Sequence, residues 1–414
     1  MNDSASAAAG EEARSAFRHR GYLLYWLSRF AATFATQIIS VAIGWQVYDL
    51  TRDPFDLGLV GLVQFLPSLA LVLVTGAAAD RFNRRHIIAA CLFVEALVSV
   101  ALIAFTWTAI AAVWPIFVML AVFGVARAFF GPASQSLLPN LVPVQDLSNA
   151  IAWNSSSWQI ATIVGPVAGG LLYGISALTA YGIALVLMSG AAFLALAIPK
   201  PPQRRSDRAA TLATLFAGFR YVWSEKVVLG AISLDLFAVL LGGAVALLPV
   251  YARDILHAGP WGLGLLRSAP GAGAILVALL LAHRPIRDHA GIIMFSFVAA
   301  FGLFTVLFGI SRLIWLSVLA LAIMGACDMV SVYVREILIQ LWTPDAVRGR
   351  VNAVNMVFVG ASNELGEFRA GVMAALIGAV PAVVVGGLGT MAVAGLWALW
   401  FPQLRRIRRL DRQI

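Results

Sequence analysis

The chain has 414 residues, of which 61% are hydrophobic and 12% are charged, and its mean hydropathy is +0.89. Because a soluble domain carries about 25% charged residues, this composition excludes an ordinary soluble protein and places most of the chain in a lipid bilayer. The net charge of +9 does not indicate a nucleic-acid partner, because the basic residues are spread over many short connections instead of gathering on one surface.

A helix crosses the hydrocarbon core of a bilayer with roughly 20 apolar residues. The sequence contains twelve runs of this kind, and we expect an all-α membrane protein with one transmembrane helix at each run. The predicted spans are residues 22–49, 55–79, 86–109, 113–137, 149–173, 177–198, 227–251, 261–282, 290–311, 313–334, 351–377 and 380–401. Together they leave no room for a sizeable soluble domain.

The chain is expected to divide once, after the sixth span. A polar, proline-rich stretch begins at Pro199 and leads into apolar residues whose spacing suits a short amphipathic helix on the membrane face. We therefore predict an N-terminal six-helix half over residues 1–198, a cytoplasmic linker over residues 199–225 and a C-terminal six-helix half over residues 226–414. Transporters are often built from such halves, related by pseudo-symmetry.

The distribution of lysine and arginine predicts the orientation of the chain across the membrane. Basic residues precede the first span and follow the second, sixth, eighth, tenth and twelfth, whereas the alternate connections hold little more than Arg52, Arg253 and Arg312. Cytoplasmic connections carry the excess of positive charge, so both termini should be cytoplasmic. The first apolar run is too long for a cleaved signal peptide.

No catalytic centre is expected. Cys91 and Cys327 lie in separate spans, and the five histidines fall at span ends or in connections, so neither residue type forms a metal or disulfide framework. The sequence has no phosphate-binding Gly-x-x-x-x-Gly-Lys-Ser/Thr pattern. We predict that the protein is not an enzyme and that it binds no metal and no cofactor.

One connection is unusually charged for so apolar a chain. Between the second and third spans the sequence reads GAAADRFNRR, and the residues of interest in it are Gly76, Asp80, Arg81, Asn83, Arg84 and Arg85. This stretch resembles the signature loop of the major facilitator superfamily, Gly-x-x-x-Asp-Arg-x-Gly-Arg-Arg, with Asn83 in place of the second glycine. Arg127-x-x-x-Gly131 in the fourth span resembles the second motif of that superfamily.

Two further similarities indicate which branch of the superfamily the chain resembles. The fifth span contains a stretch similar to the antiporter motif of the superfamily, with Gly165, Pro166, Gly169 and Gly170. Residues 132–143, 343–355 and 362–368 resemble the branch that contains enterobactin exporters. The resemblance implies the major facilitator fold, with twelve helices in two pseudo-symmetric halves, and a role in the export of siderophore-like or drug-like molecules.

The charged loop is expected to act as a cytoplasmic latch between the two halves. A tight turn needs a residue that tolerates left-handed backbone angles, and Asn83 meets that need. Asp80 would pair with the positive N-terminal end of the eleventh span, or with Arg348 or Arg350 beside it. This contact would stabilise the outward-open state. In the alternative interpretation the arginines only fix the topology.

The antiporter-like stretch has a mechanical interpretation. Gly165, Gly169 and Gly170 let a neighbouring backbone approach closely, and Pro166 removes one helix hydrogen bond, which kinks the span. A bent and closely packed span would support the rocking of one half against the other.

Ionisable residues inside a bilayer are costly unless they face a cavity or a partner. The deepest carboxylates are expected to couple transport to protons: Asp235, Asp328, Glu364 and Glu367. Glu364 and Glu367 are three positions apart and share a helix face. Because two carboxylates that close do not easily both ionise, one should hold a proton near neutral pH. The alternative is a static network in which the side-chain amides of Asn355 and Asn363 donate hydrogen bonds to both carboxylates.

Other polar residues in the spans are expected to serve the substrate or the fold. Arg335 and Glu336 should reach the solvated cytoplasmic edge of the tenth span, and Glu95 should be a structural partner of the signature loop. The predicted substrate-binding residues are Arg29, Gln37, Arg127, Asn154, Trp158, Arg267, Asn355 and Asn363. A cavity with aromatic walls and a few polar groups suits amphipathic aromatic molecules.

The predicted function is secondary active transport. We expect the protein to export small amphipathic molecules, siderophore-like or drug-like, by alternating access and in exchange for protons. Two alternatives remain open, a proton-coupled importer of a polar metabolite and a lipid flippase. The expected partners are a small-molecule substrate, protons and membrane lipids, with no nucleic acid, and we expect a monomer.

Overall fold

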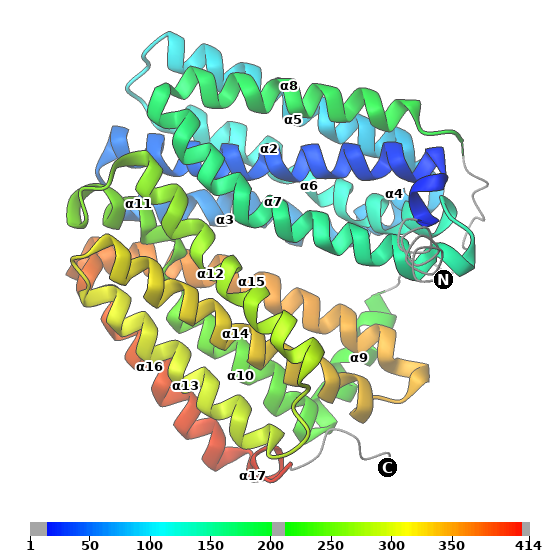
Figure 1. Cartoon of the computed structure of the whole chain (residues 1–414), viewed down its shortest axis with the longest axis vertical. Coiled ribbons are helices and arrows are strands. Elements are labelled where there is room, and N and C mark those ends of the chain that lie inside the picture. Colours follow the sequence, from blue (N-terminus) through cyan, green and yellow to red (C-terminus); the bar gives the residue numbers. More distant parts are fainter. Residues whose placement is uncertain (1–14, 201–211, 408–414) are drawn as a thin grey trace, which may run out of the picture. The chain divides into compact units, whose positions relative to one another are not determined.

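The computed structural model describes residues 15–200 and 212–407 (Figure 1). Every regular element in these residues is helical, as predicted. The elements before residue 200 are η1 (Ser15–Arg18), α2 (Arg20–Thr51), α3 (Pro54–Ala70), α4 (Val72–Arg81), α5 (Arg84–Trp107), α6 (Trp114–Leu137), η2 (Leu138–Asn140), η3 (Val144–Asp146), α7 (Leu147–Ile175) and α8 (Ala177–Ala197).

The elements after residue 211 begin with a short helix in the predicted linker and continue with the C-terminal spans. They are α9 (Leu212–Ser224), α10 (Lys226–Gly242), η4 (Val245–Leu247), α11 (Leu248–Val250), η5 (Tyr251–Ile255), α12 (Gly259–His283), α13 (Ala290–Ile310), α14 (Ile314–Trp342), α15 (Asp345–Ile377), α16 (Ala379–Trp400) and α17 (Pro402–Arg405). Residues 201–211 of the predicted linker lie outside the described residues.

The predicted spans correspond to helices of membrane length. Ten helices in the described residues are long and apolar enough to cross a bilayer. The second predicted span is built from α3 and α4, which meet at a bend of 59° and together count as an eleventh. The remaining predicted span, residues 351–377, is part of α15, a helix of 33 residues in which polar and charged residues interrupt the apolar sequence. The arrangement agrees with a twelve-helix transporter fold.

The described residues pack into two compact units. The first contains residues 15–43 and 66–200, and the second contains residues 44–65 and 212–407. The end of α2 and most of α3 therefore pack in the second unit, although they precede its other helices by about 150 residues of sequence. The predicted division into two six-helix halves, with boundaries at residues 198 and 226, stays a prediction.

In the first unit, α5 packs against both α6 and α8, and α7 packs against α8. Tyrosines of α2 fix it to neighbouring helices. Tyr22 donates a hydrogen bond to the carbonyl oxygen of Ala150 (2.9 Å) and Tyr25 donates one to that of Ser134 (3.0 Å). Both tyrosines are fully buried, so their hydroxyl groups need these partners.

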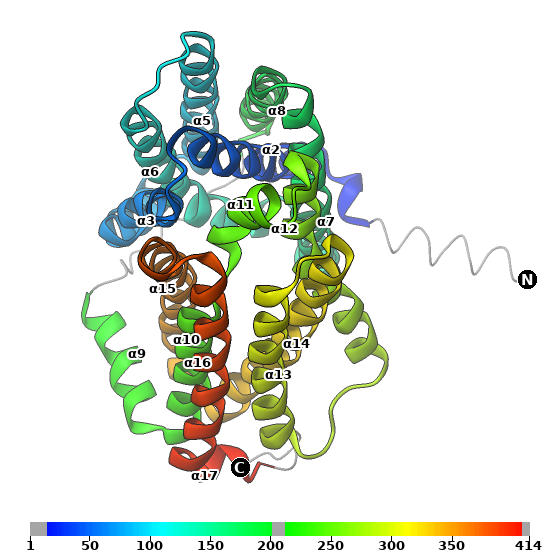
Figure 2. The ribbon, with the colours of Figure 1, turned by 90° about the vertical axis from the view of Figure 1, so that its left-hand side faces the viewer.

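In the second unit, α10 packs against α15 and α16, and α13 packs against α14 and α16, as Figure 2 shows. The core between α10, α13, α14 and α16 is apolar and contains Leu234, Met294, Val334 and Leu338. The linker helix α9 packs on α15. It is held by Tyr221, which donates a hydrogen bond to the carbonyl oxygen of Trp342 (2.6 Å).

Candidate functional site

In the second unit, two carboxylates of α15 lie within electrostatic range of an arginine of α12. Arg267 of α12 interacts electrostatically with both Glu364 and Glu367 of α15. A Cβ atom on Gly61 of α3 would lie 2.8 Å from Oε2 of Glu364 and 3.3 Å from Oε2 of Glu367. Both carboxylates therefore point to the same place on α3, as their three-residue spacing predicts. The sequence did not indicate that Gly61 faces them.

A second group of two carboxylates and one arginine lies between α10 and α14. Asp235 is 6% exposed and forms an ion pair with Arg335, which is 3% exposed. Asp328 lies on α14 near both, and a small cavity beside the group is lined by Asp235, Asp328 and Ser331. The expectation that Arg335 reaches the solvated edge of its span is wrong. Asp328 and Arg335 are seven residues apart, so both lie on the face of α14 that meets α10.

The amides proposed as partners of the Glu364–Glu367 pair make their hydrogen bonds elsewhere. Asn355 is buried and donates a hydrogen bond to Glu336 (3.1 Å), and Asn363 is exposed and donates one to the carbonyl oxygen of Val359 on its own helix (2.8 Å). The static network that was the alternative to proton coupling would need these amides at the carboxylates. Neither of these two bonds goes to Glu364 or Glu367, and the choice between proton coupling and a static network stays a prediction.

The polar residues predicted to bind substrate in the N-terminal spans occupy different environments. Arg29 donates a hydrogen bond to the hydroxyl of Ser134 (2.8 Å). Arg127 is exposed and interacts electrostatically with Glu95, which is buried on α5. The carbonyl oxygen of the Asn154 side chain is buried and has no hydrogen-bond partner among the residues that the structure describes.

Two other predicted binding residues lie on α2 and α7. Gln37 of α2 contacts α7 at Gly165, where an added Cβ would lie 2.6 Å from Cβ of Gln37. Trp158 of α7 is 48% exposed in the described residues. A common cavity for the eight predicted substrate-binding residues stays a prediction.

The antiporter-like stretch packs closely against α2. A Cβ on Gly169 would lie 3.0 Å from Cα of Ile38, so the two backbones approach as closely as the sequence indicated. Pro166 and Gly170 are also buried. The close packing of α7 on α2 is thus present, whereas its role in rocking stays a prediction.

Asn83 adopts a different conformation from the one predicted. Its φ is −68° and its ψ is 112°, which is extended and not left-handed. Its side chain accepts a hydrogen bond from the backbone N–H of Arg85 (3.2 Å) and so caps the start of α5. The polar side chain, and not tolerance of a positive φ, explains why asparagine suits this position.

The N-cap predicts a moderate loss of stability on replacement of Asn83. Asn83→Ala removes the acceptor and is expected to lower the free energy of unfolding by about 1 kcal/mol, while Asn83→Gly costs only a few tenths. Thermal unfolding of the detergent-purified protein measures both. Equal unfolding temperatures for the alanine variant and the unsubstituted protein would contradict the capping role.

The other charged residues of the signature loop make contacts within the first unit. Arg84 donates hydrogen bonds to the carbonyl oxygens of Ala79 (3.0 Å) and Ser136 (2.7 Å), and Arg85 donates one to that of Ile198 (2.7 Å). Carbonyl groups near helix ends favour such cations. The two arginines therefore connect the loop to the ends of α6 and α8.

The predicted latch residues have local partners. Asp80 lies 3.9 Å from Arg84, and Arg348 lies 2.6 Å from Asp345 in the first turn of α15. Arg81 and Arg350 are exposed, and Gly76 has room for a Cβ. The predicted contact of Asp80 with Arg348 or Arg350 would join the two units and stays a prediction.

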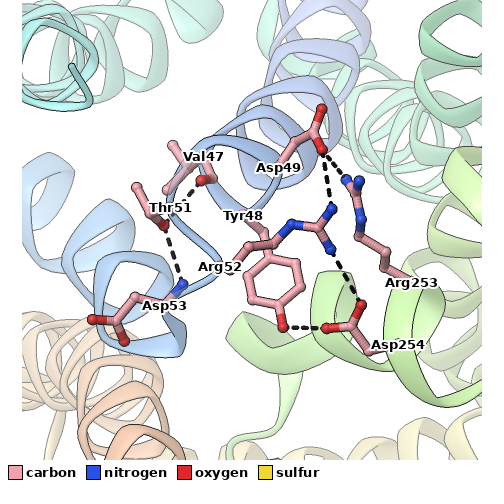
Figure 3. A network of polar contacts seen from close by, with 8 residues as sticks. All are labelled: Val47, Tyr48, Asp49, Thr51, Arg52, Asp53, Arg253 and Asp254. Atoms are coloured by element: carbon pink, nitrogen blue, oxygen red, sulfur yellow. Dashed lines mark hydrogen bonds and ion pairs between the residues drawn. The ribbon is translucent and has the colours of Figure 1, made fainter. Parts of the chain in front are cut away.

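A further group of charged residues, which the sequence did not single out as a site, lies in the second unit where α2 ends (Figure 3). Tyr48 donates a hydrogen bond to Asp254, and Arg52 lies 3.4 Å from Asp254 and 3.8 Å from Asp49. Arg253 forms an ion pair with Asp49. The sequence contained only a weak indication of this group. Arg52 and Arg253 were noted only as two of the few basic residues in connections that are otherwise poor in lysine and arginine.

Comparison with known proteins identifies the family. The model of the family described as Transmembrane secretion effector matches residues 12–413. The enterobactin exporter EntS of Shigella boydii serotype 18 is 25% identical over 409 residues, which cover 96% of this chain and 95% of the relative. EntS of Escherichia fergusonii has the same identity and the same coverage.

Solved structures show the same fold. A bacterial homologue of the human lysosomal transporter Spinster has a TM-score of 0.71 at 13% identity, covering 94% of this chain and 96% of that one. The nucleoside transporter NupG has a TM-score of 0.69 at 15% identity, with 94% and 99% covered. A bacterial homologue of the iron transporter ferroportin has a TM-score of 0.67 at 15% identity, with 94% and 99% covered.

These comparisons confirm the predicted superfamily and the predicted absence of an enzymatic role for the chain. The relatives match from end to end, and the helices long and apolar enough to span a bilayer make the protein a multi-pass membrane protein. The chain belongs to the Transmembrane secretion effector family and is a major facilitator superfamily transporter of small molecules.

Proposed function

We propose that the protein exports small amphipathic molecules, siderophore-like or drug-like, across the inner membrane of a bacterium, in exchange for protons. Both termini would lie in the cytoplasm, and the protein would work as a monomer surrounded by membrane lipids. The substrate class rests on the enterobactin exporters that the chain resembles along its whole length. Identity of 25% supports a class of substrate and not one compound.

The observation that carries proton coupling is the balance of charge in the second unit. Glu364 and Glu367 share Arg267, and Asp235 and Asp328 share Arg335. Each group has two carboxylates and one guanidinium, so each carries one negative charge in excess when both carboxylates are ionised. Such an excess is costly inside a membrane, and binding one proton removes it. A group of this kind changes its proton content when its access to water changes.

The experiment that tests this function compares small molecules inside and outside bacterial cells, with and without the protein, in iron-rich and iron-poor medium. Accumulation of a compound inside cells that lack the protein would support export, and iron dependence would mark that compound as a siderophore. Depletion inside those cells would overturn export in favour of import. Unchanged metabolites together with altered lipid asymmetry would favour a flippase.

The latch is a separate part of this proposal and has its own test. Asp80→Asn removes the charge that would hold the cytoplasmic sides of the two halves together, and is expected to lower transport several-fold with little change in folding. The matched control is Asp288→Asn, in the corresponding connection after the eighth predicted span. Export of enterobactin by proteoliposomes is the measurement. An Asp80→Asn protein that transports at the normal rate would remove the latch.

A further inference from the structure

Buried polar atoms without a hydrogen-bond partner gather in one part of the second unit. Among its described residues, Nε of Arg369 is the exception, and Nη1 of Arg335 forms the ion pair with Asp235. The others belong to the end of α14, the turn after it and the first turns of α15. They are Nε of Arg335, Oγ1 of Thr343, Nε of Arg348 and the side-chain carbonyl oxygens of Asn352 and Asn355.

These atoms belong to side chains that are well covered. Thr343 is 1% exposed and Asn355 is 5% exposed, and Arg335 is buried as described above. A buried polar group without a partner is costly, and native proteins leave few of them. Where the protein itself supplies no partner, an ordered water that makes about three hydrogen bonds is the usual one.

The unpaired atoms of α15 lie on one face of the helix. Arg348, Asn352 and Asn355 are spaced by four and three residues, so their side chains follow one another along the helix. The neighbouring face carries Val351 and Val354, which are fully buried in an apolar cluster with residues of α9, α10 and α14. The polar face is therefore a narrow stripe beside an apolar contact.

The polar stripe of α15 continues onto α14. Asn355 donates a hydrogen bond to Glu336 (3.1 Å), and Glu336 follows Arg335 directly in sequence. Thr343, in the turn that joins the two helices, accepts a hydrogen bond at its backbone carbonyl oxygen from Arg348 (3.2 Å). Polar groups are thus present at each level between this turn and Arg335.

The small cavity beside Asp328 lies at the inner end of this series. Asp328, Ser331 and Arg335 are spaced by three and four residues on α14, and the first two line the cavity. Asp328 is 14 residues from Trp342 at the end of the helix, which corresponds to about 21 Å along its axis. The polar groups therefore extend from the middle of the span to its end.

We propose that a chain of ordered water molecules, called the water path below, runs from the turn between α14 and α15 to the cavity beside Asp328 and carries protons between that cavity and the cytoplasm. Water donates to the amide oxygens of Asn352 and Asn355 and accepts from Nε of Arg335 and Arg348. This inference rests on the proposed function for the orientation of the chain and for the part of Asp328 in proton coupling.

Proton transfer along the water path consumes no water. Each molecule receives a proton from one neighbour and passes one of its own to the next, so one proton enters at the turn and one reaches the carboxylate at the cavity. Asp235 already shares an ion pair with Arg335, so Asp328 is the carboxylate that takes the proton.

The charges along the water path are balanced. Asp235 is the partner of Arg335, and Asp345 lies 2.6 Å from Arg348. Neither guanidinium therefore places an uncompensated positive charge in the way of a proton. Glu336 adds a carboxylate between the two ion pairs, where it accepts the hydrogen bond from Asn355.

The test is oxidation by hydroxyl radicals, which a short X-ray pulse produces from the water molecules next to a side chain. The chain has two cysteines, and both are buried in spans, with 6% exposure for Cys91 and 4% for Cys327. Cys327 lines the cavity at the inner end of the water path, and Cys91 on α5 is the internal control. Mass spectrometry of the full-length protein is expected to show several-fold faster oxidation of Cys327.

Two variants close the water path. Asn352→Leu and, separately, Asn355→Leu replace an amide of the stripe by an apolar side chain, and each is expected to lower the oxidation rate of Cys327 several-fold. The matched control is Gln340→Leu, which removes an exposed amide from α14 and should leave the rate unchanged. Cys91 reports folding, because a misfolded variant would oxidise it faster.

Equal oxidation of the two cysteines in the unsubstituted protein would overturn the water path. An unchanged rate for Cys327 in both asparagine variants, with Cys91 unaffected, would overturn its course along α15. Oxidation requires neither substrate nor a proton gradient, so its outcome is separate from that of the proposed function. If Cys327 is oxidised as expected and proton-driven export is absent, the water stands and the proposed function fails. If proton-driven export occurs and both cysteines react equally, only the water path fails.

Discussion

Replacement of Glu364 and Glu367 by glutamine, singly and together, is expected to abolish proton-driven export. Either single change leaves one carboxylate opposite Arg267, which is a neutral pair with no excess charge and no exchangeable proton. We expect the transport rate under an imposed pH gradient to fall at least tenfold, which corresponds to about 1.4 kcal/mol in the barrier. Uptake of enterobactin into inverted vesicles, with a pH-sensitive dye in the lumen, measures substrate and protons together.

The control for this prediction is Glu225→Gln. Glu225 is a half-buried carboxylate at the junction of α9 and α10 and lies outside the predicted spans, so its loss should leave the pH dependence unchanged. Normal transport by both glutamine variants at every pH would eliminate coupling at this pair. Coupling would then rest on Asp235 and Asp328 alone, and Asp328→Asn would be the decisive variant.

Arg335→Met is expected to cause the largest loss of stability of any single change considered. Arg335 and its partner Asp235 are both buried, and removing one member of a buried ion pair leaves an uncompensated charge that costs about 3–5 kcal/mol. Asp328 beside them adds a second carboxylate to the same place. Thermal unfolding in detergent, followed by tryptophan fluorescence, measures the loss.

A double variant distinguishes the lost charge from lost packing. Asp235→Asn combined with Arg335→Met leaves Asp328 as the one carboxylate of the group. The group then again carries a single excess charge, as in the unsubstituted protein, so the double variant should recover most of the stability that Arg335→Met loses. Arg335→Lys keeps the charge and should be intermediate, because lysine lacks the planar fork of arginine. A double variant as unstable as Arg335→Met would show that the side chain acts through packing and not through its charge.

The fold was largely predictable because the bilayer imposes simple conditions. Each span must be a helix of about 20 apolar residues, since no water satisfies backbone polar groups in the hydrocarbon core. All twelve predicted spans are helical, and the least apolar of them, α15, is also the one that carries the Glu364–Glu367 pair. An interruption of hydrophobicity within a span therefore marked the position of the carboxylates that we propose carry protons.

The partners of individual side chains were less predictable. The spacing of Glu364 and Glu367 placed them on one face of a helix, but the expected position of Arg335 at a solvated edge was wrong because the rotation of α14 turns that residue toward Asp235. Asn83 was assigned to a left-handed turn, and its observed role as a helix cap depends on where α5 begins. Errors of this kind arise because the spacing of residues in the sequence shows which of them share a face of a helix. It does not show which neighbouring helix that face contacts.

The sequence by itself determined the membrane class, the helical nature of the predicted spans and the superfamily. Only the tertiary structure decided that Gly61 lies against the Glu364–Glu367 pair and that Asp49 and Arg52 meet Arg253 and Asp254. The physical reason is the separation in sequence of the residues that make these contacts. Hydrophobic length and charge are properties of each segment alone, whereas these contacts join residues about 200 to 300 positions apart and depend on how whole helices pack.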